Sequence, residues 1–423
     1  MKLPLAATVV ALAAAACQRD RDAPATPAAQ TRDSAGIEVV ENPRPPFGSR
    51  LGWRIAPAPS LAVGSSEGDA PHLLHDVVDA LRLPDGRIVV ADGGSNELRV
   101  FDASGTHAAT WGGEGEGPGE FTSLGGTDRW RGDSLVAWNR HGPYAAIFDS
   151  RGNTGRSIRL AGTDPATFAA SLGSGGVLAF REGYQLVSRT GDATLHELRR
   201  HYEILGGEGR VAASLGEFPG RLFYTATMMG TSIVMRLPFS PSIAVAPWGG
   251  LAVVAPNRGY EIRAFGTDGT LRRIVRRDHD PVPTAPAHRE AFFVGFLRER
   301  GFSPEVAAGE EEALEQVRQT MGDIPLPETL PAFAALVTDA LDHLWVREFR
   351  ILDGEFEIPS QEVSEGPLWS VFDPDGHVLG FVETPLDLRI YEIGADYLLG
   401  HTTDELGVES VELWPLARPG PDG

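Results

Sequence analysis

The sequence predicts an all-β fold built from repeated units of short antiparallel strands, and three observations lead to this prediction. The chain of 423 residues contains 50 glycines and 32 prolines, a content typical of many strands joined by tight turns. Residues 88–121 alternate strand-like runs with turn residues, and a similar turn pattern recurs further along the chain. Because a single apolar core rarely grows past about 250–300 residues, a chain of this length needs several domains or a repeat architecture.

Residues 88–121 show the repeated unit most clearly. A β-branched run at 88–90 is followed by the turn residues Asp92-Gly93-Gly94. The alternating run 98–101 ends in another Asp/Gly turn, and a third run at 107–111 leads into a glycine-rich loop. Aspartate and glycine at these positions favour tight turns, so the segment is predicted to form strand, turn, strand, turn and strand.

The hairpin signature of this unit recurs along the chain as an aromatic residue, a short polar turn and a glycine. Its four copies are Phe101–Gly105, Phe148–Gly152, Phe265–Gly269 and Phe372–Gly376. The first two glycines are 47 residues apart, a spacing that suits a four-stranded blade of a β-propeller. The spacing predicts a six-bladed β-propeller over residues 51–416, with blades at 70–121, 122–162, 163–220, 221–277, 333–385 and 386–416, the last completed by 51–64.

The segment 278–332 interrupts this pattern with helical spacing and is predicted to be a two-helix insertion between the fourth and fifth blades. Apolar residues recur at Phe292, Phe293, Phe296 and Leu297, and Ser303-Pro304 is a typical helix start. The helical pair would form either a lid or rim at the mouth of the central channel, or a peripheral decoration packed on a blade edge through Phe292, Phe296 and Leu314. The sequence leaves both readings open.

The N-terminus has the features of an export signal. Residues 1–16 combine a positive start at Lys2, an apolar run and small alanines, a span too short to cross a membrane. Cys17 is the only cysteine of the chain and follows these alanines, so it is predicted to be lipidated and to anchor the protein to the cell envelope. The alternative is ordinary cleavage that leaves an incidental cysteine. Residues 17–50 are expected to form a flexible tether.

The charge of the chain excludes one large class of partners. The formal net charge is −21, so no basic field is available to neutralise nucleic acid phosphates. We therefore expect no nucleic acid partner, and a membrane contact through the N-terminal lipid only. The expected protein is a monomer whose protein or small-molecule ligand the sequence does not identify.

Repeated aspartates are the residues that most resemble catalytic or metal-binding groups. Asp92, Asp102, Asp149 and Asp373 all stand at turns, where a carboxylate commonly accepts hydrogen bonds from nearby backbone amides. The histidines are scattered without metal-ligand spacing, and no nucleophile motif is present. We therefore predict no catalytic residue, no metal site and no cofactor.

A polar and aromatic cluster near the start of the second blade is the candidate ligand-binding site. It contains Asp128, Arg129, Trp130 and, slightly further along, His141. Residues of these types at a channel mouth are suited to ligand binding. The competing structural interpretation is that Trp130 packs at a blade edge beside a turn at Gly132-Asp133.

The unit at 91–121 resembles an NHL repeat. The matching residues are Ala91, Asp92, Asn96, Phe101, Asp102, Gly105, Gly117, Gly119, Glu120 and Phe121, while Arg99 stands one place later than the pattern has it. The match covers about one blade, and the other blades keep only the hairpin signature. As a whole the chain resembles the six-bladed β-propeller lipoproteins of bacteria.

The resemblance implies an extracytoplasmic propeller, and the absence of a catalytic motif favours a binding or scaffolding module. Function in such folds resides in surface loops rather than in the fold itself. The alternative is a propeller enzyme similar to the calcium-dependent lactonases and lyases of the same shape, with its site at the channel mouth under the helical insertion. An enzyme should gather several carboxylate, Asn or His side chains with shifted pKa values at one end of the channel.

Overall fold

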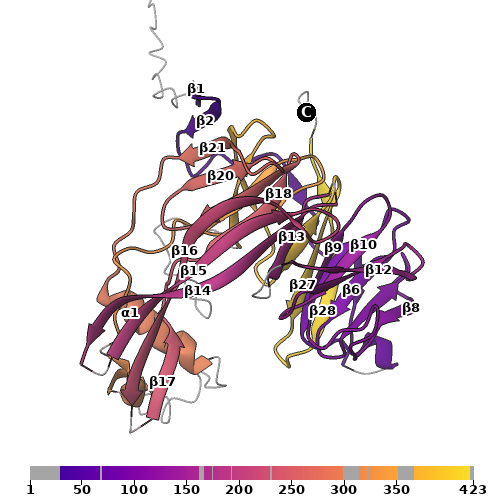
Figure 1. Ribbon diagram of the computed structural model, residues 1–423, viewed down its shortest axis with the longest axis horizontal. Coiled ribbons are helices and arrows are strands. Elements are labelled where there is room, and N and C mark those ends of the chain that lie inside the picture. Colours follow the sequence, from indigo (N-terminus) through magenta and orange to yellow (C-terminus); the bar gives the residue numbers. More distant parts are fainter. Residues whose placement is uncertain are drawn as a thin grey trace, which may run out of the picture.

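The protein is mostly β structure, as the sequence predicts. The computed structural model describes residues 29–66, 69–161, 166–173, 175–191, 193–228, 231–298, 314–319, 321–322, 324–350 and 366–419. In these residues the strands form six separate sheets of four to six strands (Figure 1). Cys17 and the proposed start of the second helix at Ser303-Pro304 lie outside the described residues.

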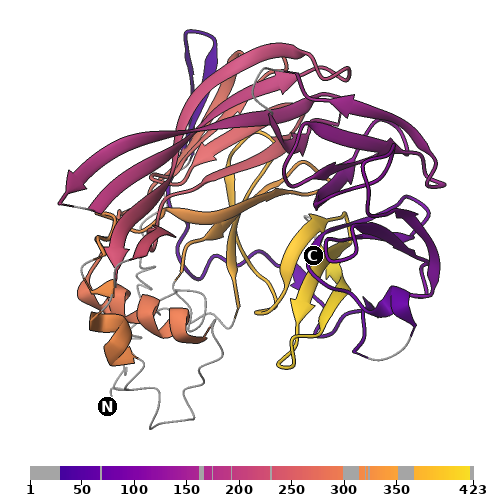
Figure 2. The same ribbon diagram turned by 60° about the horizontal axis from the view of Figure 1, so that its bottom comes forward.

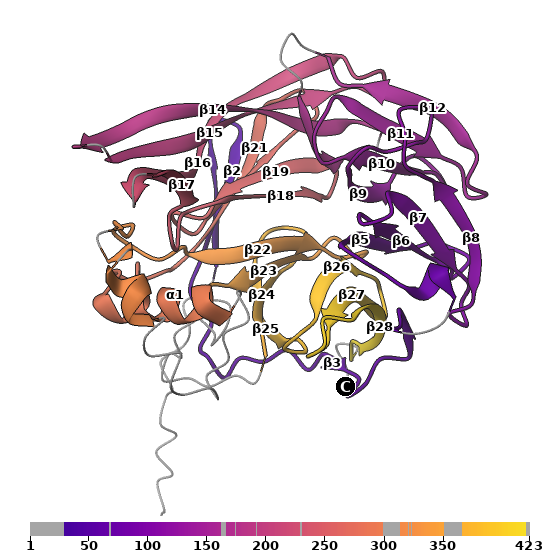
Figure 3. The same cartoon turned by 90° about the horizontal axis from the view of Figure 1, so that it is seen from below.

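The six sheets are arranged as a ring. The first strand of each sheet contacts the first strand of the next, in the cyclic order β5, β9, β13, β18, β22, β26 and back to β5. Figure 3 looks onto this ring, and the sheets follow one another around it in sequence order. Such radial repetition of small antiparallel sheets is the architecture of a β-propeller.

Three of the sheets are simple four-stranded meanders. Their strands are β5 Val77–Arg82, β6 Ile88–Asp92, β7 Glu97–Phe101 and β8 His107–Gly112; β9 Leu124–Arg129, β10 Leu135–Asn139, β11 Tyr144–Phe148 and β12 Thr154–Arg159; and β22 Phe333–Thr338, β23 Leu344–Glu348, β24 Leu368–Phe372 and β25 Val378–Glu383. The middle strands are buried on both faces, because each sheet packs between two neighbours, and they therefore consist of continuous apolar runs.

The contact between the first two sheets shows how the repeated residues hold the ring. Trp111 and Phe148 stack with ring centroids 6.4 Å apart, and Phe121, at the end of the glycine-rich loop, packs on the same Phe148 ring. Gly152 lies so close to the indole of Trp111 that a Cβ atom there would overlap it. The aromatic and glycine positions of the signature therefore serve to join blade to blade.

The N-terminal residues add two strands to the fourth sheet. This sheet contains β18 Ile243–Trp248, β19 Leu251–Pro256, β20 Glu261–Phe265 and β21 Leu271–Arg277, and its outer edge continues with β2 Ile37–Asn42 and β1 Gln30–Ser34. The expectation of a flexible tether is therefore wrong for residues 30–42. Val39 and Val40 are buried where β2 pairs in parallel with β21, and this burial stabilises the segment as a strand.

The last sheet combines strands from early and late in the sequence. Its strands are β26 Arg389–Ile393, β27 Tyr397–Thr403 and β28 Glu409–Ala417, and β28 also pairs with β3 Arg54–Ile55 and β4 Leu61–Val63. The short helix η1, Ala70–His72, follows and leads into β5. Residues near the start of the chain thus hydrogen-bond to its last strand.

The third sheet extends well beyond the ring. It consists of β13 Thr167–Ser171, β14 Val177–Thr190, β15 Ala193–Leu205, β16 Val211–Met228 and β17 Thr231–Arg236. The sequence interpretation placed a blade boundary between residues 220 and 221. That boundary is wrong, because β16 is a single strand of 18 residues and the next sheet begins only at β18. We call the projecting part, residues 181–191, 193–200, 217–228 and 231–236, the arm (Figures 1 and 2).

The helix α1, Pro286–Arg298, lies between β21 and β22 in sequence and packs on the arm. Phe292, Phe293 and Leu297 of the helix share an apolar cluster with Leu237 and Phe239, which follow β17. Residues 314–319 are also helical, and Leu314 lies against the same cluster. The arm and the helical segment therefore form a small core of their own beside the ring.

Candidate functional site

Three carboxylates lie on the innermost strands where the first, second and last sheets meet. Asp79 belongs to β5, Asp128 to β9 and Glu392 to β26, and these strands contact one another around the ring centre. Negative charge on Asp128 raises the pKa of Asp79, and Glu392 in turn raises that of Asp128. Asp128 is therefore close enough to interact with both of the other carboxylates, and the three groups form the candidate site.

Asp79 bonds to the neighbouring blade. Its Oδ2 accepts a hydrogen bond of 3.2 Å from the backbone amide of Thr127 on β9, and its Oδ1 accepts one of 2.9 Å from Ala80. Burial raises the pKa of Asp79 to about 8, more than these amides lower it. The carboxyl group is therefore largely protonated at neutral pH.

Asp128 repeats the arrangement one blade further along. Its Oδ2 accepts a hydrogen bond of 3.2 Å from the backbone amide of Ser171 on β13, and its Oδ1 accepts one from Arg129 at 2.7 Å. Burial raises the pKa of Asp128 to about 6, so this carboxyl group is largely ionised at neutral pH.

Glu392 forms the corresponding bond between the last sheet and the first sheet. Its Oε2 accepts a hydrogen bond of 3.1 Å from the backbone amide of Arg82, and its Oε1 forms an ion pair of 2.9 Å with Arg129. The hydroxyl of Tyr397 donates to the same Oε1, and the guanidinium of Arg82 lies over the Tyr397 ring at 4.8 Å. The carboxylate of Glu392 is thus fully bonded within the protein.

The chemistry open to this site follows from the unequal pKa values. Two neighbouring carboxyl groups whose pKa values are pushed apart can serve as an acid and a base. In this ring, however, each carboxylate already accepts a backbone amide from the adjacent sheet. The same bonds also join blade to blade, so the arrangement serves the stability of the ring directly.

The structure separates the four residues that the sequence interpretation grouped as a ligand site. Asp128 and Arg129 belong to the cluster at the ring centre. Trp130 is 6% exposed and packs in the apolar cluster between the second and third sheets, in agreement with the competing structural interpretation. His141 is exposed in the turn between β10 and β11, and among the described residues it forms no hydrogen bond, ion pair or ring contact with the other three.

Sequence reasoning missed Asp79 and Glu392. A signal for Asp79 was present, because an aspartate inside the otherwise strand-like run Val77–Arg82 is unusual for an innermost strand. Glu392 had no comparable signal, since its role depends on Arg129, which is distant in sequence.

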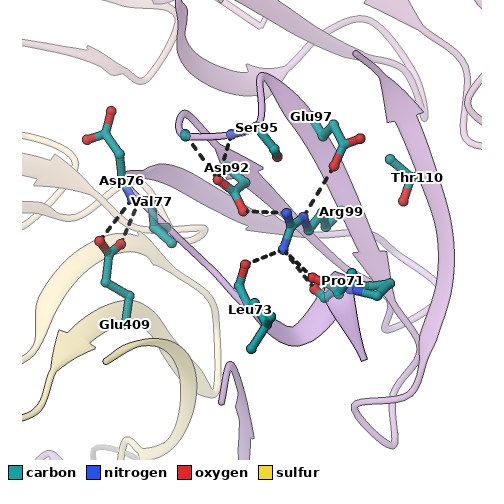
Figure 4. Close-up of polar contacts among 12 residues, drawn as sticks. Pro71, Leu73, Asp76, Val77, Asp92, Ser95, Glu97, Arg99, Thr110 and Glu409 are labelled. Atoms are coloured by element: carbon teal, nitrogen blue, oxygen red, sulfur yellow. Dashed lines mark hydrogen bonds and ion pairs between the residues drawn. The ribbon is translucent and has the colours of Figure 1, made fainter. Parts of the chain in front are cut away.

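The repeated aspartates act as turn caps, as predicted. The Oδ1 atoms of Asp102, Asp149 and Asp373 each accept two backbone amides of their own turn at 2.8–3.0 Å. Asp92 also caps its turn, through the amides of Gly94 and Ser95, but its role extends beyond the turn (Figure 4).

Asp92 also holds Arg99, which fixes the entry to the first blade. Asp92 Oδ2 lies 3.1 Å from the Arg99 guanidinium, and burial raises the pKa of Asp92 although this cation lowers it. Arg99 donates to the carbonyl oxygens of residues 70, 71 and 73 at 2.6–3.2 Å (Figure 4). The helical turn before β5 is thereby tied to β7.

The last and first sheets are joined in the same region by Glu409. Its carboxylate accepts the backbone amides of Asp76 and Val77 at 2.9 and 2.7 Å (Figure 4). His401 Nε2 lies 3.2 Å from the same Oε2 that accepts the amide of Val77, and burial lowers the pKa of His401 more than Glu409 raises it. His401 is therefore largely neutral at pH 7, and this group of residues serves to close the ring.

Two surface hollows lie away from the carboxylates. One of about 490 Å³ is lined by residues of the last sheet that include Leu388, Thr402 and Trp414. The other, of about 240 Å³, lies between Phe218 and Arg263.

In the described part of the chain, no group of three or more His, Cys, Asp or Glu side chains is placed to hold a metal ion. None of the described helices is long and apolar enough to cross a membrane.

Comparison with known proteins gives similarity in structure alone. No family model matches the chain, and no curated protein matches it by sequence. A protein from Bacteroides fragilis described as exported is 11% identical, with 90% of this chain and 100% of that chain covered and a TM-score of 0.46. A member of the DUF4221 family from Bacteroides vulgatus is 8% identical over 87% and 99% of the two chains, with a TM-score of 0.44. Virginiamycin B lyase from Staphylococcus aureus is 9% identical over 86% and 99%, with a TM-score of 0.37.

Proposed function

We propose that the protein is an exported six-bladed β-propeller that is anchored to the cell envelope through a lipid on Cys17 and acts as a binding or scaffolding module. In this proposal each sheet of the ring is one blade, and the insertion 278–332 stands between the fourth and fifth blades. The export signal at 1–16 and the position of the single cysteine support the location.

One observation carries the proposal of a binding module. The carboxylates at the ring centre are bonded to the backbone of the neighbouring blade, as Asp79 is to Thr127 and Asp128 is to Ser171. These bonds make the ring a rigid support, while the arm extends from it as an additional surface. Rigid rings that present variable surfaces are well suited to holding partners.

The anchor is tested by replacing Cys17. The mature wild-type protein should begin with a diacylated Cys17 in mass spectrometry and sediment with the membrane fraction. Cys17→Ser should move the protein into the soluble extracytoplasmic fraction. An unmodified Cys17 in the mature wild-type protein would contradict the anchor.

The binding function is tested by capture in the envelope of the producing cell. A photo-crosslinking residue is placed at Tyr184 on the arm and, in a second variant, at Asp133 in a ring turn. The proposal expects a discrete cross-linked complex from at least one site, and expects it to persist in the double variant Asp79→Asn, Asp128→Asn. If neither site gives a discrete complex, the binding function is wrong.

A second candidate function rests on the unequal pKa values of Asp79 and Asp128, which suit an acid and a base. An enzyme of this type would hydrolyse a lactone or cleave a small substrate by elimination. The test measures hydrolysis of a panel of lactones with and without calcium. Turnover that is lost in Asp79→Asn would favour the enzyme, whereas rates equal to those in buffer alone support the binding module.

A further inference from the structure

The two faces of the arm have different environments. Residues that stand opposite each other on neighbouring antiparallel strands point to the same side of a sheet. Leu222 and Tyr224 of β16 point toward the helical segment and lie against its apolar cluster. Arg221 and Phe223, which alternate with them, therefore point to the opposite side, away from the helix.

Three arginines lie on this second face, one on each of three neighbouring strands. Arg200 is on β15, Arg221 on β16 and Arg236 on β17, where Arg236 stands opposite Phe223. We call the surface formed by these arginines, together with Tyr184 and Phe223, the arginine face.

The positive charge of the arginine face is only partly neutralised. Arg200 bonds Glu182 at 2.8 and 3.0 Å, but no ion pair involves Arg221 or Arg236 among the described residues. Burial lowers the pKa of Arg221, the charges of Arg236 and Arg200 lower it further, and the charge of Glu182 opposes this shift without reversing it. An anion that binds between guanidinium groups that repel each other stabilises them. This local excess of positive charge occurs in a chain whose net charge is −21.

Exposed apolar side chains accompany these arginines. Tyr184 is 65% exposed and packs edge-on against Phe223 with ring centroids 6.0 Å apart. Leu186 on β14 and Val234 on β17 are 50% and 66% exposed. The strand register places both side chains on the same side of the sheet as Phe223. Leu186 pairs with His196, and His196 pairs with Phe223. Val234 lies two residues before Arg236, which pairs with Phe223, so it points to that side as well. The face therefore combines positive charge with apolar surface.

We propose that the arginine face binds an extended acidic segment of a partner protein, in which carboxylate and apolar side chains alternate. Arg200 stands opposite Phe218 of β16 and Arg236 opposite Phe223, so these two positions are roughly 10 Å apart across the sheet and about 16 Å apart along the strands, with Arg221 between them. Alternate side chains of an extended peptide recur about every 7 Å, so two or three carboxylates can meet these arginines while the apolar side chains face Tyr184 and Val234. This inference rests on the proposed binding function and names the chemistry of its partner.

The position of the arm favours a protein partner over a lipid surface. The first described strands, β1 and β2, lie at one end of the molecule, and the arm ends at the opposite end with α1 (Figure 1). β1, the described segment nearest in sequence to Cys17, therefore lies away from the arm.

The test measures binding of a fluorescein-labelled peptide of six Glu-Val repeats to the full chain by fluorescence anisotropy. We expect saturable binding that weakens when salt is raised from 50 to 300 mM, because the contact is ionic. The double variant Arg221→Gln, Arg236→Gln should weaken binding at least 10-fold, whereas Arg151→Gln, an exposed arginine in a turn of the second sheet, should leave it unchanged. Tyr184→Ser changes no charge and should weaken binding by a smaller factor, which provides a readout if the arginine variant fails to fold.

Four results would overturn the inference. The first is failure of the Glu-Val peptide to bind, and the second is equal binding of a peptide of six Lys-Val repeats. Salt-sensitive self-association that the double variant abolishes would assign the face to a second copy of the chain. Binding to phosphatidylglycerol vesicles that the double variant abolishes would assign it to an anionic membrane. The proposed binding function would survive these results, because it depends on capture in the envelope rather than on this peptide.

Discussion

Replacement of Asp79 by Asn should make the protein more resistant to alkaline pH. The folded state holds this carboxyl group with a pKa of about 8, because removal of water around the half-buried side chain disfavours its charged form, and its ordinary value is 3.8. Between these two values the folded protein keeps a proton that the unfolded chain has released. The free energy of unfolding therefore falls as pH rises through this window, by at most about 1.4 kcal/mol per pH unit from this one group.

The magnitude follows from the width of the window. From pH 5 to pH 8 the contribution of Asp79 decreases by up to about 4 kcal/mol. Asn has the shape of the protonated carboxyl group and its oxygen can still accept the amide of Thr127, so Asp79→Asn removes the titration while it keeps this blade-to-blade bond. Relative to the wild type, the variant should gain stability over this range.

The assay is urea unfolding followed by tryptophan fluorescence at pH 5, 6, 7 and 8. The control is Asp133→Asn, which removes the same charge from an exposed turn. The difference in free energy of unfolding between Asp79→Asn and wild type should grow by about 2–4 kcal/mol from pH 5 to pH 8, and the control should show no such change. A difference that stays constant across this range would refute the argument that Asp79 is folded in its protonated form.

Three further substitutions test how the ring and the arm are held together. Asn42→Ala removes a 3% exposed side chain that accepts a hydrogen bond from the amide of Val378 and donates to two carbonyl oxygens. Thermal unfolding should therefore show a free energy of unfolding that is lower by about 2–4 kcal/mol. An unchanged Tm would contradict this role. Gly152→Ala places a Cβ atom against Trp111, at a residue whose φ is 85°. We therefore expect a lower Tm and a change in the fluorescence of that tryptophan. A wild-type spectrum and Tm would show that the contact is not tight. Phe293→Ala removes a ring that is 1% exposed from the apolar cluster between α1 and the arm, and it should lower the free energy of unfolding by about 3–5 kcal/mol. Hydrogen exchange should become faster in β16 and β17 but not in β6. Equal protection of all three strands would show that this cluster does not hold the arm.

The sequence predicted the β structure because the signals for it are local. Asp102, Gly105 and their copies determine a turn through bonds within five residues, so their chemistry can be recognised without knowledge of the partner strand. The position of β16 could not be predicted in this way. Its apolar and polar residues suit either a blade boundary or a longer strand, and only packing against α1, which is distant in sequence, favours the longer strand.

The candidate site was predicted only in part for the same reason. Asp128 and Arg129 stood out because charged residues lie next to a tryptophan in sequence. Their partners, Glu392 and Ser171, lie in other blades, and no spacing rule connects residues so far apart in the chain. Trp130 resembled a ligand-binding aromatic residue, yet apolar burial between two sheets accounts for it.

The path of the first described residues has a consequence for how the ring unfolds. β2 pairs with β21, Leu51 donates to the carbonyl oxygen of Phe381 on β25, and β4 pairs with β28, so one segment spans the fourth, fifth and last sheets. Each of these three sheets can separate from the ring only if it breaks its own contact with that segment or pulls the segment away from the other two. We therefore expect them to unfold as one cooperative unit, unlike linear repeat arrays in which each repeat depends on its neighbours alone. β28 lies far along the sequence from its partners β3 and β4, so a chain that stops before residue 409 would leave the segment at 54–63 without its partner strand.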